Sequence, residues 1–128
     1  MPFDFPYRAP IGDLEILADA KARISGKNMW VKGRFEDGDR HCLVAALSLA
    51  SGSRSFNIPN KTERRLARLL AQQLSPDLPW RMRSRLVPAR SRLMSFNDYP
   101  RTRQGDVDAL FDRTIFCLVT KDREFIPA

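Results

Sequence analysis

The residues that most enzymes use for metal and nucleophilic chemistry are scarce in this chain. Its 128 residues include one histidine and two cysteines. No CxxC, HExxH or EF-hand spacing occurs, and neither a glycine-rich phosphate loop nor a GxGxxG motif is present. We therefore predict no metal site and no bound cofactor.

Long apolar segments are also absent. No apolar run approaches about 18 residues, and the opening MPFDFPYRAP has Asp4 and three prolines where a signal peptide needs an apolar core. Hydrophobic content of 43% is typical of a globular domain. Cys42 and Cys117 lie in apolar segments that favour free buried thiols, with a single disulfide as the alternative. We predict a cytoplasmic protein that does not bind membranes.

The spacing of apolar residues, together with capping residues and prolines, predicts a single all-α domain. Helices are expected over residues 13–24, 42–51, 61–74, 88–95 and 102–119, with a short turn or helix at 80–87. The segment 42–51 is apolar nearly all round, so we place it at the centre of four to five helices. Asn60, followed three residues later by Glu63, predicts a variant capping box at the start of the third helix.

The remaining segments are predicted as follows. Residues 28–40 favour either a short hairpin near residues 29–36 or a loop beneath Trp30. Residues 1–10 are expected to form an extended arm because their prolines block a helix. Residues 11–120 are then the helical domain, and residues 121–128 a C-terminal tail.

The positive charge is concentrated in the middle of the chain. The net charge is +7, and residues 61–103 contain eleven Lys or Arg against three acids, whereas residues 1–60 contain eight against seven. A local surplus of this kind attracts anionic partners. Nine of these residues form what we call the predicted basic face: Lys61, Arg64, Arg65, Arg68, Arg81, Arg83, Arg85, Arg90 and Arg92.

The predicted basic face suggests the first functional hypothesis. Arginine suits phosphates because its planar fork donates hydrogen bonds in pairs. We expect a non-enzymatic binding or regulatory protein whose partner is a nucleic acid first and an acidic protein second, with a merely solvated surface as the alternative. Trp80 and Phe96 are candidates for stacking on unpaired bases. A helix-turn-helix is disfavoured because Pro79 falls where the recognition helix would begin or run.

The second hypothesis is an enzyme that uses Cys42 or the Asn97-Asp98 pair. A cysteine at a helix start can have a stabilised thiolate, but His41, the adjacent residue, points about 100° away around a helix. We therefore interpret Cys42 first as a buried structural thiol. Asn97 and Asp98 are interpreted first as turn-forming residues in a loop. A binding protein should expose a convex basic surface, and an enzyme should show a concave pocket at Cys42 or Asp98 with a disturbed pKa nearby.

A third hypothesis is a structural module that forms a homodimer. Phe116, Val119 and Phe125 would extend an apolar surface beyond the core in this case.

Several short motifs occur in an order that is similar to their order in one known family. They are Leu17 with Ala20, Trp30, Cys42-Leu43, Ala46-Leu47, Asn97-Asp98 and Thr102 followed by VDALFDR at residues 107–113. This order resembles a small family of bacterial and phage proteins known only as a domain of unknown function, over residues 14–116. The resemblance implies a compact helical domain centred on the helix that starts at Cys42-Leu43, and no particular reaction. It also suggests that Trp30, Cys42, Asn97 and Asp98 cluster in one site.

Overall fold

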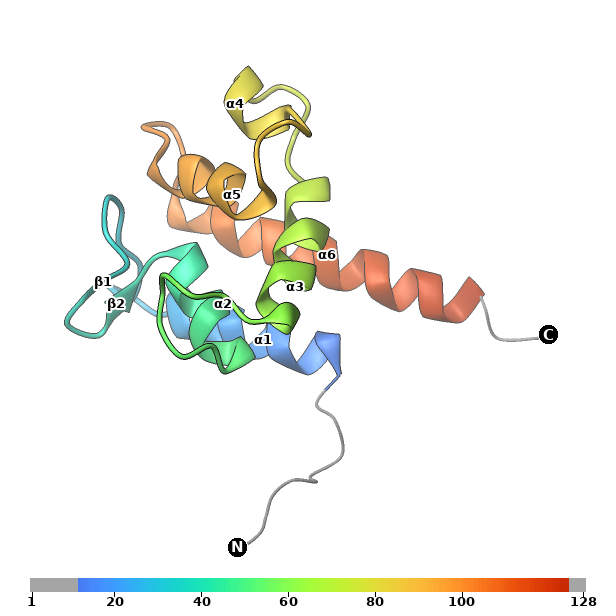
Figure 1. Cartoon of the computed structure of the whole chain (residues 1–128), viewed down its shortest axis with the longest axis horizontal. Coiled ribbons are helices and arrows are strands. Elements are labelled where there is room, and N and C mark those ends of the chain that lie inside the picture. Colours follow the sequence, from blue (N-terminus) through green and yellow to red (C-terminus); the bar gives the residue numbers. More distant parts are fainter. Residues whose placement is uncertain (1–11, 125–128) are drawn as a thin grey trace, which may run out of the picture.

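The computed structural model describes residues 12–124, which form six helices and one small antiparallel hairpin (Figure 1). The helices are α1 (Asp13–Ser25), α2 (Leu43–Ser51), α3 (Lys61–Gln72), α4 (Trp80–Arg83), α5 (Ala89–Asp98) and α6 (Gln104–Glu124), and the strands are β1 (Glu36–Asp37) and β2 (Arg40–His41). The predicted all-α class is confirmed, although the described range has six helices where four or five were expected. The predicted arm, residues 1–10, lies outside the described residues, as do residues 125–128 of the predicted tail.

Helix α2 lies at the centre of the fold, as its lack of a polar face predicts. The side chains from Leu43 to Leu47 have no exposed surface. Helices α1, α3 and α5 all pack against α2. Cys42 is its N-cap and accepts a hydrogen bond from the Ala45 N–H, and Gly52 ends the helix with a φ of +79°. The alanines on α2 allow its neighbours to approach closely.

Helix α3 begins at the predicted cap but without the second half of a capping box. The Asn60 side chain accepts a hydrogen bond from the Glu63 N–H at 2.8 Å. The Asn60 N–H donates instead to the Ser53 hydroxyl at 3.1 Å, because the Glu63 carboxylate is used elsewhere. That carboxylate is fully buried and accepts hydrogen bonds from Ser48 and Ser53, both at 2.7 Å, and from Arg90 Nε at 2.8 Å. Glu63 therefore joins α2, α3 and α5.

The hairpin lies later in the chain than residues 29–36, where it was predicted. Glu36 pairs with His41 and Asp37 with Arg40, so Gly38 is the first of the two loop residues, with a φ of +64°. A two-residue loop with positive φ at this position needs glycine, and this requirement fixes the hairpin at residues 36–41. Trp30 lies beside β2 through an isolated parallel bridge to His41.

Prolines divide the segment after α3, as predicted. Pro79 and Pro88 are the N-caps of α4 and α5. Helix α4 is a single turn, shorter than the predicted 80–87, because Ser84 already has an extended backbone. Helix α5 continues to Asp98, so the Asn97-Asp98 pair lies in the last turn of a helix. The expectation that the pair lies in a loop was wrong.

Helix α6 is longer than the predicted 102–119 and runs antiparallel to α1. Lys21 donates to Asp112 at 2.8 Å, and Ser25 donates to Asp108 at 2.8 Å. Figure 1 shows the C-terminal half of α6 extending past the other helices. None of the described helices combines the length and apolar character needed to cross a bilayer.

Replacing Glu63 by alanine should destabilise the fold by about 3–5 kcal/mol, because Arg90 would keep a largely buried charge without its partner. Urea unfolding of Glu63→Ala and the wild type measures this difference. Asp77→Ala, an exposed acid changed in the same way, should alter the unfolding free energy by less than about 0.5 kcal/mol. Equal losses in the two variants would contradict the role assigned to Glu63.

Candidate nucleic-acid interface

Two adjacent hollows lie between α3, α4 and α5. The larger has a volume of about 770 Å³ and the smaller about 510 Å³. Gln72, Arg85 and Arg92 line both, so the two hollows are neighbours. We call them together the arginine groove, after its arginines Arg64, Arg68, Arg83, Arg85, Arg90 and Arg92. No acidic residue of the described chain lines either hollow.

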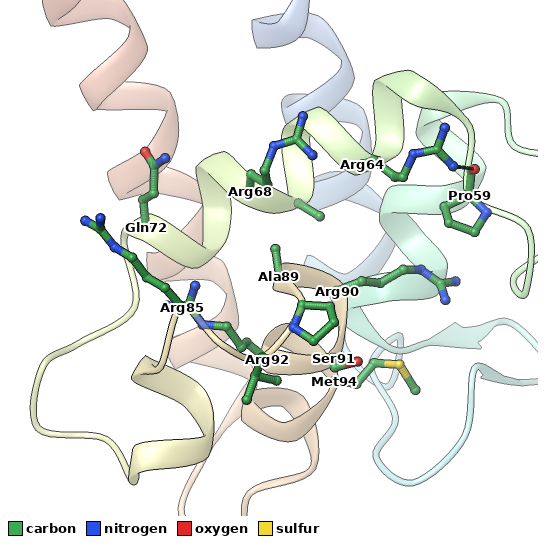
Figure 2. A pocket seen from close by; sticks show the side chains of 13 residues that line it. Pro59, Arg64, Arg68, Gln72, Arg85, Ala89, Arg90, Ser91, Arg92 and Met94 are labelled. Carbon is green, nitrogen blue, oxygen red and sulfur yellow. Dashed lines mark hydrogen bonds between the residues drawn. The ribbon is translucent and has the colours of Figure 1, made fainter.

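The arginines come from two facing walls. Arg64 and Arg68 are four residues apart on α3 and project from the same side of that helix. Figure 2 shows them on one wall, with Arg90 and Arg92 of α5 on the other and Arg85 at the end of the groove near Gln72. The arrangement is concave, whereas a binding surface was expected to be convex.

Three of the six arginines are held by backbone carbonyls, which fix a guanidinium without neutralising it. Arg92 donates from Nε to the Met82 carbonyl at 2.8 Å and from Nη2 to the Ala71 carbonyl at 3.3 Å. Arg64 donates to the Pro59 carbonyl, and Arg83 to the Leu78 carbonyl, both at 2.6 Å. Of the six, Arg90 alone is paired with a carboxylate of the described chain, at 2.8 Å from Glu63. The other five have no carboxylate partner among the described residues.

Arg68 and Arg85 are the most available of the five. Both are exposed, and neither has a hydrogen bond or ion pair with the described part of the chain. Burial lowers the pKa of Arg92, and the nearby charge of Arg85 lowers it further. Arginine nevertheless stays protonated at neutral pH. The like charges of Arg85 and Arg92 repel each other, so an anion bound between them would be stabilised.

Three residues of the predicted basic face lie outside the arginine groove. Arg65 forms an ion pair with Asp13 of α1 at 2.6 Å. Lys61 and Arg81 are exposed and line neither hollow. The nine residues therefore do not converge on one side. Positions 64 and 65 point in different directions because they are about 100° apart around the helix.

The two aromatic residues proposed for base stacking differ in exposure. Phe96 is only 5% exposed and belongs to the core, so it is not available to a ligand. Phe96 lies three residues after Leu93, and this helical spacing places both side chains on the same, buried face of α5. Trp80 is 57% exposed on α4.

The structure brings together Trp30, Cys42, Asn97 and Asp98. Asn97 Oδ1 accepts hydrogen bonds from Trp30 Nε1 at 2.7 Å and from the Leu43 N–H at 3.0 Å. Asn97 Nδ2 donates to the Val31 carbonyl at 3.1 Å and to Asp98 Oδ1 at 3.0 Å. We call this set the Asn97 network. Because the Asn97 amide uses both its oxygen and its nitrogen within the protein, its role here is to join segments of the fold.

A separate hollow of about 340 Å³, which we call the Cys42 pocket, adjoins the Asn97 network. It is lined by Gly33, Arg34, Phe35, Cys42, Met94, Asn97 and Asp98. Asp98 Oδ1 also accepts a hydrogen bond from the Gly33 N–H at 2.8 Å. A concave pocket with Cys42 and Asp98 is the geometry expected of an enzyme. The direction of the Cys42 pKa shift therefore decides between a nucleophilic and a structural role for the thiol.

The Cys42 thiol is not activated. Its side chain is buried with 5% exposed, and burial raises the pKa of Cys42, with a smaller contribution from the charge of Asp98. The backbone N–H groups at the start of α2 act in the opposite direction but are outweighed. A nucleophilic cysteine needs a lowered pKa. These properties favour a structural role. Cys42 and Cys117 are both free thiols.

Two further findings concern the homodimer hypothesis and metal binding. Phe116 is 71% exposed on α6, while Phe125 lies outside the described residues, and homodimer formation stays a prediction. Within residues 12–124, no group of three or more His, Cys, Asp or Glu side chains is placed to hold a metal ion.

Sequence reasoning missed the role of Glu63, although a signal was present. Glu63, Leu66 and Leu70 follow helical spacing on one face, which places an acid within the buried stripe of α3. A buried acid requires a partner, and Arg90 on another helix could not be identified as that partner from spacing alone.

Replacing Asn97 by alanine should destabilise the protein by about 2–5 kcal/mol, because the Trp30 indole N–H and the Leu43 N–H would each lose a partner. Chemical unfolding monitored by circular dichroism measures the change. Asn57→Ala, in an exposed loop, is the matched control and should be nearly neutral. A neutral Asn97→Ala would show that the network does not hold the fold together.

Cys42 should react more slowly with iodoacetamide at pH 7 in the folded protein than after unfolding. Cys117→Ser leaves Cys42 as the single thiol for this measurement. Because folding raises the pKa of Cys42, the stabilisation by its neutral thiol is complete below the unfolded value of about 8.5 and is lost as pH rises through the folded value. Unfolding free energies of Cys117→Ser between pH 7 and 10 should fall accordingly. Faster reaction in the folded state would contradict the structural role.

Comparison with known proteins identifies one relationship. The model of a family described as a family of unknown function (DUF6197) matches residues 9–116, a range that contains the arginine groove and the Asn97 network. Comparisons with curated proteins and with solved structures found no match. The chain therefore belongs to DUF6197, a family of unknown function, as the resemblance in its sequence indicated.

Proposed function

We propose that this protein is a non-enzymatic nucleic-acid-binding protein whose arginine groove holds the phosphate backbone. The observation that supports the proposal is the gathering of six arginines around two adjacent hollows that no described acid lines. Phosphate contacts of this kind give affinity and position but carry no sequence information. The proposal therefore concerns recognition of the backbone and not of a particular sequence.

The shape of the groove favours a nucleic acid over an acidic protein. Arg64, Arg68 and Arg85 lie along one continuous depression, so they can meet phosphates that repeat along a strand. Arginine binds a phosphate through two parallel hydrogen bonds, which suits the exposed guanidinium groups of Arg68 and Arg85.

A regulatory or binding role is also supported by the properties of the thiol in the Cys42 pocket. Its thiol has a raised pKa, which is opposite to the requirement for a nucleophile. We also propose a cytoplasmic location, because both cysteines are free and such thiols persist in reducing compartments.

Replacing Arg68 and Arg85 together by alanine should weaken binding of a fluorescent 12-nucleotide oligomer and reduce its salt dependence. Each lost phosphate contact lowers the slope of log K against log salt by roughly 0.7–0.9. Fluorescence anisotropy from low to physiological salt measures both quantities. The matched control, Lys27→Ala/Arg103→Ala, removes two exposed charges that line neither hollow. It should retain most of the slope.

Two outcomes would overturn the proposed function. If no DNA or RNA oligomer binds with an affinity that falls as salt rises, the groove does not hold a phosphate backbone. If both double variants lose affinity equally, net charge and not the arginine groove is responsible. Polyglutamate as a competitor tests the acidic-protein alternative: displacement of the oligomer at equal charge concentration would favour that alternative.

A further inference from the structure

The α4 end of the arginine groove exposes two large apolar side chains. Trp80 is 57% exposed and Leu86 is 87% exposed. Figure 1 shows α4 and the turn after it projecting from the body of the helices, beyond α3 and α5. An exposed tryptophan beside a charged groove is informative, because large aromatic side chains are usually buried.

Trp80 is held outward by the anchoring of α4. Met82 is buried with 5% exposed, and its carbonyl accepts the hydrogen bond from Arg92. Trp80, two residues earlier, projects from the other side of the single turn. Arg83 lies three residues after Trp80, on the neighbouring position of the same side, and it lines the smaller hollow. Trp80 lines neither hollow itself, but it neighbours Arg83, which lines the smaller one.

Three arginines follow Trp80 within five residues, and one exposed acid, Asp77, precedes it by three residues. Arg83 is held by the Leu78 carbonyl, and Arg81 and Arg85 have no ion pair with the described residues. A partner that meets this surface must therefore combine a flat apolar group with negative charge. An unpaired nucleotide has both, since its base presents a π-face and its phosphate is anionic.

We infer that the nucleic acid held in the arginine groove is single-stranded and that one of its bases stacks on Trp80 where the strand leaves the groove. This inference rests on the proposed function. Bases inside a duplex have both faces covered by their neighbours, so an aromatic ring can stack only on an unpaired base. Phosphates next to the stacked base would lie at Arg83 and Arg85.

The test compares three probes with equal numbers of phosphates: a single-stranded 12-mer, the same strand with abasic sites, and a duplex. The wild type should bind the base-bearing single strand about 5- to 100-fold more tightly than the abasic strand. Trp80→Leu should lose this preference while it keeps the salt slope, because the arginines are unchanged. Trp80→Phe preserves an aromatic ring and should retain most of the preference.

Fluorescence gives a direct reading of stacking. The single-stranded probe should quench the wild-type tryptophan emission, and Trp80→Phe should remove that quenching, because the remaining tryptophan, Trp30, is tied to Asn97. Far-UV circular dichroism checks that the variants fold.

Specific outcomes would overturn the inference and leave the proposed function standing. These are equal affinity for base-bearing and abasic strands, tighter binding of the duplex, or unchanged affinities in Trp80→Leu. Vesicles of anionic phospholipid form a further arm, and quenching of Trp80 by vesicles but not by the single strand would assign the surface to a lipid. If no probe binds in a salt-dependent way, the proposed function itself fails.

Discussion

A buried ion pair between Glu63 and Arg90 joins the two helices that form the walls of the arginine groove. A carboxylate without exposed surface is stable only when its oxygens are satisfied, and here Ser48, Ser53 and Arg90 all donate to it. The spacing of α3 and α5 is therefore set by hydrogen-bond geometry as well as by apolar packing. Arg90 is used for this purpose, and the proposed phosphate contacts therefore fall to the arginines that backbone carbonyls hold or that have no partner in the described chain.

The other end of α5 is fixed by the Asn97 network. Asn97 connects α5 to the start of α2 and to the segment at Trp30 and Val31. With both ends fixed, α5 separates the arginine groove from the Cys42 pocket, and Met94 lines both. The Arg90 guanidinium also lies 5.8 Å from the Phe35 ring centre, so the two hollows share a wall.

The helices were predictable from sequence because their ends are marked locally. Asn60 caps α3, Pro79 and Pro88 precede α4 and α5, and the apolar segment from Leu43 is central. The hairpin was misplaced because residues 29–35 have the composition of a strand, whereas the tight turn at Gly38 determines the pairing. Strand propensity is a weak guide to the position of a strand where a tight turn fixes the register of the pairing.

The candidate site was less predictable because it depends on tertiary pairing. The sequence shows that the basic residues are concentrated in residues 61–103, but periodicity does not tell which of them meet an acid. Arg65 is paired with Asp13, 52 positions away, and Arg90 with Glu63, 27 positions away. The cluster of Trp30, Cys42, Asn97 and Asp98 came from the family resemblance, since nothing in the spacing of these residues indicates contact.

The positive potential of the arginine groove arises from the placement of the few acids nearby as much as from the number of arginines. Residues 61–103 contain Glu63, Asp77 and Asp98 as their only acids. Glu63 is buried against Arg90, and Asp98 accepts the N–H groups of Gly33 and Asn97 on the side of the Cys42 pocket. No carboxylate of the described chain is thus left to line the groove. The Glu63 carboxylate is directed inward and that of Asp98 to another face, while Asp77 is exposed but lines neither hollow. This separation of charge localises positive potential at the groove despite a modest net surplus.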